Sequence, residues 1–539
     1  PARGWPPRVL PRRLWRTARR LVDTRGEARR PHGTPALCVE GFVAMLRGRT
    51  SPLGWSADRP QGACVPAFDT DYLVIGAGAT GLAFADTLLH ESSDAHITLV
   101  DRQALPGGHW NDAYPFVALH QPSAFYGVNS LPLGSNRKDV SGHNAGLYEL
   151  AGGTEICSYY QQVMQHSLLP SGRVRYLPLH EFEGLQDGQA RLVSRLTGAV
   201  TDVAVRRKLV NAAHFMPEVP ATTPPNFAVA EGVRLLTPTE LTQLGQGQAP
   251  APSGYCIVGA GKTAMDAAVW LLGQGVPPGA IQWVMPRDSW VVNRLTAQPG
   301  EEFFMQSMGG LVQQMRALAA ATDVDDLFLR LEAAGQMLRI DQQRLPRMFH
   351  YATLSEGEVA LLRQITQVIR QGRVLAIEPE ALVLEGGRVA MPPGVVYVHC
   401  CASAVRQRRN HAIFEPGRIT PQLLRVPLMP FSAAVCAYVE AHYADDAQKN
   451  ALCTPVPFPH DVAGYLMATL VSQGNQLRWN QDKTLRGKHQ TRLDGFGSLT
   501  ANVDRNDTQK MAVLSDLRQF IGPAMANAQR LLAAAAPVV

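Results

Sequence analysis

The stretch YLVIGAGATG, residues 72–81, decides the fold of this chain, because an apolar strand runs into a glycine-rich turn and then into a helix. A second stretch of this kind, YCIVGAGKTA, follows at residues 255–264. In each turn the first glycine permits the bend, the second lets backbone approach a pyrophosphate, and the third position lets helix pack on strand. The pyrophosphate lies at the helix N-terminus, where N–H groups and the dipole favour negative charge. Two such turns predict two bound dinucleotides and electron transfer between them.

The two turns supply most of the predicted cofactor-binding residues. We expect Lys262 and Thr263 to contact the phosphates of the second dinucleotide, because both lie where the second helix begins. The full predicted set is Gly76, Gly78, Ala79, Thr80 and Gly81 in the first turn, and Gly259, Gly261, Lys262, Thr263 and Ala264 in the second.

The residues that follow each turn distinguish the two sites. The apolar run that begins at Ala95 ends in Asp101, and a carboxylate at the end of this strand can bind ribose hydroxyls. The run after the second turn, residues 280–285, has no acid at its end and continues into Arg287, which favours the 2′-phosphate of NADPH. Asp288 offsets part of that charge. The alternative for both Asp101 and Arg287 is an ordinary surface charge.

Residues 70–430 resemble the superfamily of flavin-containing monooxygenases and Baeyer–Villiger monooxygenases. The first turn, the Asp101 strand with Arg102 beside it, and the second turn with Arg287 carry the resemblance. The run Gly107-Gly108-His109-Trp110 is similar to the family's Gly-Gly-x-Trp element, and Tyr114-Pro115 falls where the family often has Tyr-Pro. Residues 123–129, SAFYGVN, are similar to the stretch in which flavin-containing monooxygenases place an asparagine beside the flavin.

Two departures from the family pattern indicate a divergent branch. The fingerprint F-x-G-x-x-x-H-x-x-x-Y/W is absent ahead of the second turn, where residues 232–238 read GVRLLTP. The usual Ala-Thr-Gly turn is replaced twice, by NAA at residues 211–213 and by CAS at residues 401–403.

The resemblance implies FAD at the first turn, NADPH at the second, and a loop over residues 109–129 beside the flavin. We expect Asn129 to hydrogen-bond the reacting oxygen or the nicotinamide, and His120 and Tyr126 to contact flavin or substrate. For Trp110 and Tyr126 the alternative is a core aromatic, and for His120 a satisfied polar residue. The other cofactor contacts expected from this region of the chain are Gly108, His109, Trp110, Gln121 and Ser123.

The resemblance also implies the reaction. NADPH reduces FAD, the reduced flavin forms a C4a-peroxyflavin with molecular oxygen, and one oxygen atom passes to a small molecule, with N-hydroxylation as one form. Two alternatives stay open. One is an NADPH-dependent flavin reductase or oxidase without oxygen insertion, which the missing fingerprint favours. The other is a dinucleotide-binding sensor or scaffold without enzymatic activity.

Composition narrows the function classes. The net charge of +6 misleads, because residues 1–60 hold thirteen Arg against four acidic residues and leave the remainder mildly acidic. We therefore expect no nucleic-acid partner. No apolar run approaches the ~18 residues that a transmembrane helix needs, so we expect no integral membrane contact. The prediction is a cytoplasmic enzyme, with organelle import through the Arg-rich leader as an alternative.

Cysteine spacing argues against a disulfide reductase and against a structural zinc site. None of the eight cysteines forms a C-x-x-C or C-x-x-x-x-C pair, which disfavours a disulfide reductase. The same spacing offers no structural zinc site, so we expect no metal.

The predicted fold class is α/β, with two Rossmann-like domains: a discontinuous FAD domain and an inserted NADPH domain with a helical insert. We expect the strand that ends at Cys400 to return the chain to the FAD domain, and the insert to cap the active site or form a homodimer contact. The predicted segments are a basic leader at 1–65 (disordered, targeting or artificial, and dispensable for chemistry), the first segment of the FAD domain with a linker at 66–250, the NADPH domain at 251–375 with its insert at 303–372, the second segment of the FAD domain at 376–447, and a C-terminal helical segment at 448–539.

Overall fold

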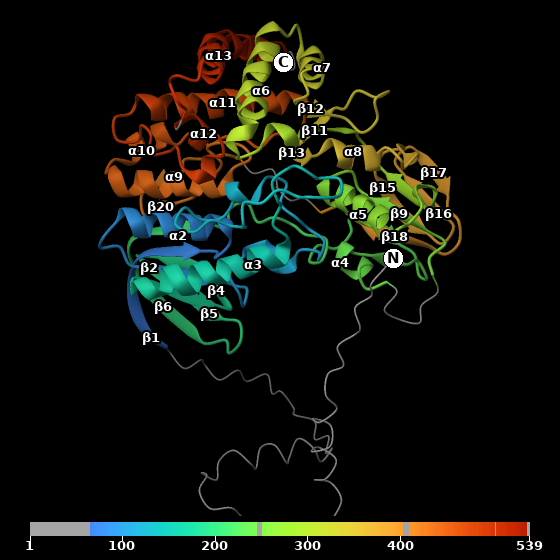
Figure 1. Cartoon of the computed structure of the whole chain (residues 1–539). Coiled ribbons are helices and arrows are strands. Elements are labelled where there is room, and N and C mark those ends of the chain that lie inside the picture. Colours follow the sequence, from blue (N-terminus) through green and yellow to red (C-terminus); the bar gives the residue numbers. More distant parts are fainter. Residues whose placement is uncertain (1–64, 245–250, 403–408, 502, 536–539) are drawn as a thin grey trace, which may run out of the picture. The chain divides into compact units, whose positions relative to one another are not determined.

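The structure is a computed structural model that describes residues 65–244, 251–402, 409–501 and 503–535 (Figure 1). These residues belong to one compact unit, Gly62–Val539. The basic leader predicted at residues 1–65 lies, apart from its last residue, outside the described residues. Within the described ranges, no helix is long and apolar enough to cross a membrane.

The first sheet is built around β1 (Val65–Ile75), which pairs in parallel with β2 (Ile97–Asp101) and with β6 (Val200–Asn211). Side chains alternate along β1. Tyr72 and Val74 pack on α2 (Ala79–Glu91) and α9 (Met429–His442), whereas Leu73 packs on the opposite layer. The strand order is β19 (Phe414–Glu415), β20 (Arg418–Ile419), β6, β1, β2 and β3 (Val174–Pro178); the opposite layer is β4 (His180–Gln186) with β5 (Gln189–Ser194).

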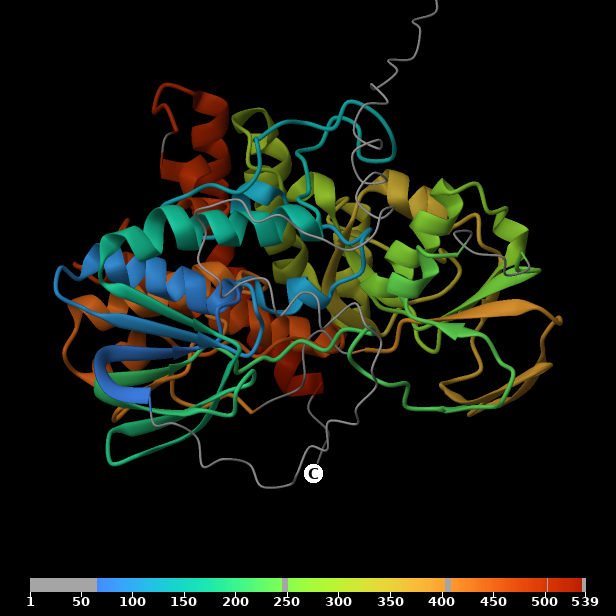
Figure 2. The ribbon, with the colours of Figure 1, turned by 90° about the horizontal axis from the view of Figure 1, so that it is seen from below.

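The second sheet has β9 (Gly254–Val258) near its centre, and its strands pair in parallel. Ile257 faces α5 (Lys262–Gly273) and α8 (Glu356–Leu362), whereas Cys256 and Val258 face a small layer of mixed strand direction. Figure 2 shows the two sheets from below. The order is β14 (Gln367–Ile369), β10 (Ile281–Val284), β9, β18 (Val395–His399) and β8 (Leu235–Leu236); the small layer is β17 (Gly387–Ala390), β16 (Ala381–Leu384), β15 (Val374–Glu378) and β7 (Ala228–Val229).

The strand that ends at Cys400 differs from the prediction. We expected it to return the chain to the FAD unit, but β18 pairs with β9 from Val395↔Gly254 to His399↔Val258, inside the second sheet. All five of its residues are buried, as suits a strand with covered faces on both sides, and such a run does not reveal to which sheet it belongs. The chain rejoins the first sheet only at β20, which pairs with β6.

The predicted helical insert is partly a sheet. Helices α6 (Phe304–Ala320) and α7 (Val324–Ala333) form as expected. Toward the end of the predicted insert, a capping box of Ser355 and Glu358 starts a short α8, which ends at Leu362, and β14 follows in place of further helix. A three-stranded sheet of β12 (Met337–Leu338), β11 (Ser289–Asn293) and β13 (Met348–Leu354) was not predicted.

The C-terminal segment is helical, as predicted, and it packs on both the first sheet and the insert. Trp479 of α11 (Val462–Gln481) lies in the same core as α2 and α9. Ala524 and Leu531 of α13 (Thr508–Ala535) lie in the core of the insert, with Trp290 of β11. The remaining helices here are α10 (Asp446–Leu452), the short turn Arg492–Asp494 and α12 (Gly497–Ala501).

Candidate functional site: two dinucleotide turns

A cavity of about 460 Å³ lies at the carboxyl ends of β1 and β2. This is where parallel sheets bind nucleotides. Nine of the predicted residues line it: Gly76, Gly78, Ala79, Thr80, Asp101, Arg102, Gly108, His109 and Tyr126. The first turn, the end of the second strand and the Gly-Gly-x-Trp element therefore come together as expected.

The N-terminus of α2 faces this cavity without a side-chain cap. Its N-cap is Gly78, no side chain accepts a bond there, and the first helical turn has no acid. The capped helices α7, α8, α10 and α11 each use Asp or Ser for this purpose. An uncapped N-terminus at a cavity suits a ligand phosphate.

Close packing explains one glycine of this turn and one of the Gly-Gly-x-Trp element. A Cβ on Gly81 would lie 1.9 Å from the Gly76 carbonyl oxygen, so only glycine lets α2 approach β1. A Cβ on Gly108 would lie 3.1 Å from the Gly78 Cα, and Gly108 itself has a φ of +58°. The first turn and the Gly-Gly-x-Trp element are therefore in backbone contact.

Asp101 is more deeply engaged than predicted. Its Oδ2 accepts a bond from Ala77 N at 2.6 Å and its Oδ1 accepts one from Gln103 N at 2.8 Å. Burial raises the pKa of this carboxyl, against these backbone bonds. Because each carboxylate oxygen can accept a second bond, Asp101 can hold the turn and still accept from a ribose.

The aromatic side of the cavity is a linked set. Trp110 Nε1 donates to the Tyr126 hydroxyl at 2.8 Å, and the Trp110 ring lies 4.9 Å from the His109 ring. Burial lowers the pKa of His109 to about 4 and raises that of Tyr126 to about 12. Both side chains are thus neutral near pH 7. Trp110 does not line the cavity but supports Tyr126, as in the core-aromatic alternative.

Asn129, which we expected to contact the reacting oxygen or the nicotinamide, packs against α2. It does not line the cavity, and its amide donates to Thr87 Oγ1 of α2 at 3.4 Å. The next residue, Ser130, is bonded to the buried Asp86 through its backbone N at 3.1 Å and through its hydroxyl. These contacts hold residues 129–130 against the side of α2.

Two other predicted cavity contacts are also placed elsewhere. Ser123 is buried; its hydroxyl donates to Glu149 O at 3.1 Å and accepts from Ala151 N at 2.8 Å, so it ties two segments of backbone together. Gln121 is half-buried and does not line the cavity.

His120 lies near the second turn rather than the first cavity. Burial lowers its pKa well below the usual value, and the positive charges of Lys262 and Arg294 lower it further. Arg294 is fully buried, with Nη2 3.0 Å from Glu358 Oε2 and Nη1 bonded to Asn144. Arg294 thus joins Asn144, which follows the first glycine turn in the chain, to Glu358 of α8, which packs on the second sheet. Sequence reasoning missed this residue because its partners are distant in the chain.

The second turn has the expected backbone geometry. Gly259 has a φ of +133°, and a Cβ there would lie 2.7 Å from the Cys400 carbonyl oxygen. Gly261, the N-cap of α5, has no side-chain cap and no atom within 4 Å of where a Cβ would lie. The first position is thus closed by β18, and the second faces open space.

Side chains around the start of α5 connect the second glycine turn to the loop over residues 109–129. Lys262 Nζ forms an ion pair with Asp266, and the Tyr114 hydroxyl donates to Asp266 Oδ2 at 2.7 Å. Burial raises the pKa of Tyr114 well above its usual value, and Asp266 raises it further. Thr263 partly opposes this rise in the pKa of Tyr114, and Ala264 is buried. Tyr114 thus packs directly on the second turn.

Arg287 leaves the second sheet at the edge that bears the second turn, because β10 and β9 are parallel and in register at Val284↔Val258. It is exposed, and no described carboxylate lies within ion-pair distance of it. Asp288, which we expected to offset its charge, instead accepts two bonds from Arg370, at 2.9 and 3.0 Å.

The C-terminal segment supplies a residue that sequence reasoning missed. Arg492 donates to the carbonyl oxygens of Tyr126 at 2.9 Å and Leu131 at 3.2 Å, and also to those of Ala124 and Val128. Burial lowers the pKa of its guanidinium from the usual value. One side chain therefore fixes the segment that carries Tyr126 to the cavity.

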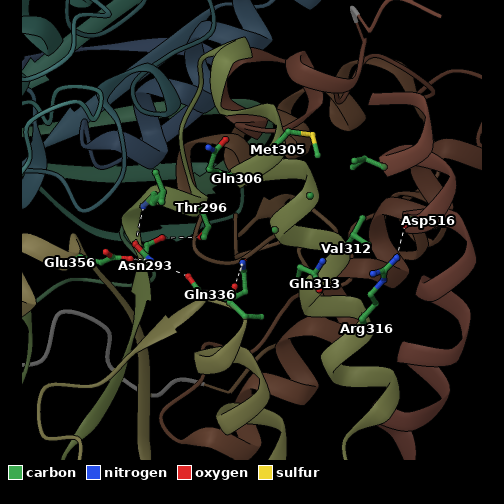
Figure 3. A pocket seen from close by; sticks show the side chains of 16 residues that line it. Asn293, Thr296, Met305, Gln306, Val312, Gln313, Arg316, Gln336, Glu356 and Asp516 are labelled. Atoms are coloured by element: carbon green, nitrogen blue, oxygen red, sulfur yellow. Dashed lines mark hydrogen bonds and ion pairs between the residues drawn. The ribbon is translucent and has the colours of Figure 1, made fainter. Parts of the chain in front are cut away.

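A further cavity of about 440 Å³ lies between β11, α6 and α13 (Figure 3). Two of its amides are engaged with neighbours: Asn293 Nδ2 donates to Glu356 Oε1 at 3.1 Å, and Gln336 Oε1 accepts from Gln314 at 3.1 Å. No predicted site residue lines it. In the described ranges, no group of three or more His, Cys, Asp or Glu side chains is placed to hold a metal ion.

Comparison with known proteins supports the dinucleotide units. A family model described as an NAD(P)-binding Rossmann-like domain matches residues 74–132. Uncharacterized protein Rv2000 of Mycobacterium tuberculosis and Uncharacterized protein Mb2023 of Mycobacterium bovis are each 43% identical over 478 residues, which cover 88% of this chain and 87% of the relative. The chain belongs to the same family as these two mycobacterial proteins. The two sheets, each with parallel central strands and a glycine turn, confirm the predicted fold class.

Solved structures that are similar to this chain include two monooxygenases and a disulfide reductase. A flavin-containing monooxygenase from Stenotrophomonas maltophilia has a TM-score of 0.40 at 15% identity, over 72% of this chain and 99% of that one. The open crystal structure of cyclohexanone monooxygenase has a TM-score of 0.44 at 13% identity, over 76% and 99%. A bacillithiol disulfide reductase from Staphylococcus aureus has a TM-score of 0.40 at 10% identity, over 66% and 90%.

Proposed function

We propose that this chain is an FAD-dependent, NADPH-reduced monooxygenase that acts on a small molecule. The observation that carries the proposal is the pair of uncapped glycine turns, Gly76–Gly81 and Gly259–Ala264, each at the carboxyl edge of its own parallel sheet within one compact unit. One dinucleotide turn suits a dehydrogenase or a simple flavoprotein. Two suit the transfer of a hydride from one bound dinucleotide to another.

The residues at the first turn fit FAD. The α2 N-terminus would bind the pyrophosphate, Asp101 would accept from the ribose, and the cavity extends to Tyr126 and to apolar residues such as Phe182 and Phe458. Gly76, Gly78, Ala79, Thr80, Arg102, Gly108 and His109 would complete the contacts. When bound, the flavin supplies two-electron chemistry and, once reduced, reactivity toward molecular oxygen.

The residues at the second turn fit NADPH. Gly261 leaves space for backbone to approach a pyrophosphate, and Lys262 and Thr263 lie at the same helix start. Arg287 offers an exposed guanidinium that no described acid neutralises, which favours a 2′-phosphate. The overall reaction converts NADPH, a proton, oxygen and substrate into NADP⁺, water and oxygenated substrate.

Within the first cavity, the protein's own groups orient and donate. Tyr126 keeps its proton near pH 7 because burial raises its pKa to about 12, so its hydroxyl can donate to a developing negative charge. His109 stays neutral and adds no positive charge beside it. Arg492 fixes the backbone that carries Tyr126. We therefore assign the donor role to Tyr126 and not to Asn129.

The alternative of an NADPH-dependent reductase or oxidase without oxygen insertion keeps one supporting observation. Asn129, the residue expected beside the flavin, is bonded to α2 instead. A monooxygenase needs a site that directs oxygen onto substrate rather than to hydrogen peroxide.

One experiment tests both functions. The purified full chain is given NADPH and ¹⁸O₂ with a panel of amines, ketones and sulfides, and product mass and hydrogen peroxide are measured. Monooxygenase activity predicts FAD in the preparation and a product carrying one labelled oxygen. NADPH oxidation that yields only hydrogen peroxide across the panel supports the reductase or oxidase. Absence of both flavin and NADPH oxidation refutes both.

A further inference from the structure

The most informative surface outside the two turns lies where β13 begins, beside the loop that carries Arg287. Asp288 O accepts bonds from the backbone N of Arg347 and of Met348, each at 3.3 Å, so residues 287–288 and 347–350 are neighbours. Val462 N donates to Arg347 O at 3.4 Å, which brings the start of α11 to the same place.

Two histidines meet on this surface. His350 of β13 is exposed, whereas its neighbour Phe349 is buried in the insert core, as strand alternation requires. The ring of His460 lies 5.5 Å from the ring of His350 and nearly perpendicular to it, at 78°. His460 in turn lies 5.9 Å from Phe458, which lines the FAD cavity.

The acidic groups around these histidines are already engaged. Asp288 is bonded twice to Arg370, and Asp325 accepts two bonds from Arg347 at 2.6 and 2.7 Å. Asp461 accepts from Gly464 N at 2.8 Å as the N-cap of α11. Arg287 has no acidic partner among the described residues. The surface therefore carries an excess of one positive charge, that of Arg287, beside two histidines whose nearest acids are bonded elsewhere.

The protonation of the histidines reflects this excess. Although His350 is exposed as a residue, its ring loses solvation where it packs against its neighbours, which lowers its pKa; His460 and Arg287 lower it further, while Asp461 acts in the other direction. Burial also lowers the pKa of His460, again opposed by Asp461. Both rings are neutral near pH 7 without a ligand. An anion placed between them would favour protonation, so its binding would take up protons.

We propose that His350 and His460, together with Arg287, form an anion site that recognises the 2′-phosphate of NADPH with uptake of protons. The inference rests on the proposed function, since it assumes that a nicotinamide dinucleotide binds at the second turn. Arg287 leaves the sheet at the edge of that turn, and the two histidines extend its charge toward the FAD cavity. They are specificity-determining residues, and they make the preference for NADPH over NADH depend on pH.

The test uses the flavin-loaded full chain and isothermal titration calorimetry with adenosine 2′,5′-bisphosphate, with 5′-AMP as the ligand that lacks the 2′-phosphate. Binding of the bisphosphate should tighten by ~3–10-fold from pH 8 to pH 6.5, where its phosphates are still largely dianionic, and that of 5′-AMP should change little. Titration in buffers of different ionisation enthalpy should show net proton uptake for the bisphosphate alone.

The double variant His350→Gln with His460→Gln isolates the histidines, because glutamine keeps polarity and loses the titration. It should weaken bisphosphate binding by ~5–20-fold at pH 6.5, abolish the proton uptake and leave 5′-AMP unchanged. His166→Gln, at an exposed histidine of another segment, is the matched control and should behave as wild type. Flavin content and circular dichroism confirm that each variant folds.

Two results would overturn the inference in distinguishable ways. If the double variant folds and keeps the wild-type affinity and proton uptake, the histidines do not recognise the phosphate, although the proposed function stands. If wild type binds neither 5′-AMP nor the bisphosphate, the second turn does not bind an adenine dinucleotide, and the proposed function fails together with the inference.

Discussion

Gly261 permits the sharpest test of the second dinucleotide site. No atom lies within 4 Å of where its Cβ would be, so Gly261→Val places two methyl groups in open space and should leave the fold intact. The same space is where backbone would approach a pyrophosphate. The variant should therefore lose the nucleotide without losing the protein.

The magnitude follows from the bonds at the start of α5. This helix has no side-chain cap, so at least two N–H groups would bond the pyrophosphate, and charge-assisted bonds contribute about 1.5–3 kcal/mol each. Their combined loss, about 3–6 kcal/mol, corresponds to a ~10²–10⁴-fold weaker binding of NADPH. Stopped-flow reduction of the bound flavin over a range of NADPH concentrations measures this, and flavin content should stay normal.

Gly259→Ala is the matched comparison in the same turn. Its Cβ would lie 2.7 Å from the Cys400 carbonyl oxygen on a backbone with a φ of +133°, so this smaller substitution should destabilise the fold, by about 1–3 kcal/mol in urea unfolding. The reasoning is refuted if Gly261→Val reduces its flavin with wild-type affinity for NADPH. It is equally refuted if Gly261→Val unfolds more readily than Gly259→Ala.

Three further substitutions test the other assignments. Arg287→Ala should raise the apparent Michaelis constant for NADPH by about ten- to a hundredfold and leave that for NADH nearly unchanged, because one charge-assisted contact of about 1.5–3 kcal/mol is lost. Steady-state kinetics with both reductants measure this, and an equal loss with both would make Arg287 structural. Arg492→Ala should lower the free energy of unfolding by about 2–4 kcal/mol and release flavin, because several carbonyls lose their donor. The control Arg486→Ala, at an exposed arginine bonded to one carbonyl, should change the free energy of unfolding by under about 0.5 kcal/mol. Unchanged stability of Arg492→Ala in urea would contradict the assignment. Asn129→Ala should leave flavin reduction and hydrogen peroxide release within about twofold of wild type, because the residue contacts α2 and not the cavity; a rise in peroxide would restore its place beside the flavin.

The sequence predicted the elements of the site that are local in the chain. Each glycine turn joins a strand to the next helix, so its geometry depends on a few consecutive residues. Asp101 and Arg287 were found because the carboxyl ends of parallel neighbours meet at one edge. Even here, the engagement of Asp101 by Ala77 N was not predictable, since it depends on how the turn closes.

The elements that sequence reasoning missed are made by distant segments. A buried run such as Val395–His399 suits either sheet, and only packing chose the second. Arg492 reaches the carbonyl of Tyr126 from the far end of the chain, and no local pattern marks it. Asn129 was placed by the family pattern alone, and its contact with Thr87 of α2 depends on how this loop packs, which that pattern does not specify.

β20 belongs to the first sheet and α9 packs on it, yet both come late in the chain, and this has a consequence for biosynthesis. Leu423 and Met429 also line the cavity around Gly76, and both follow all strands of the second sheet in the chain. At ribosomal speeds of about 5–20 residues per second, the segments that close this cavity emerge on the order of 20–70 s after its glycine turn. The second sheet, whose strands all lie between Leu235 and His399, is complete before then. We therefore expect the nascent chain to complete its second sheet first and to bind flavin only after the residues around Leu423, Met429 and Phe458 have emerged.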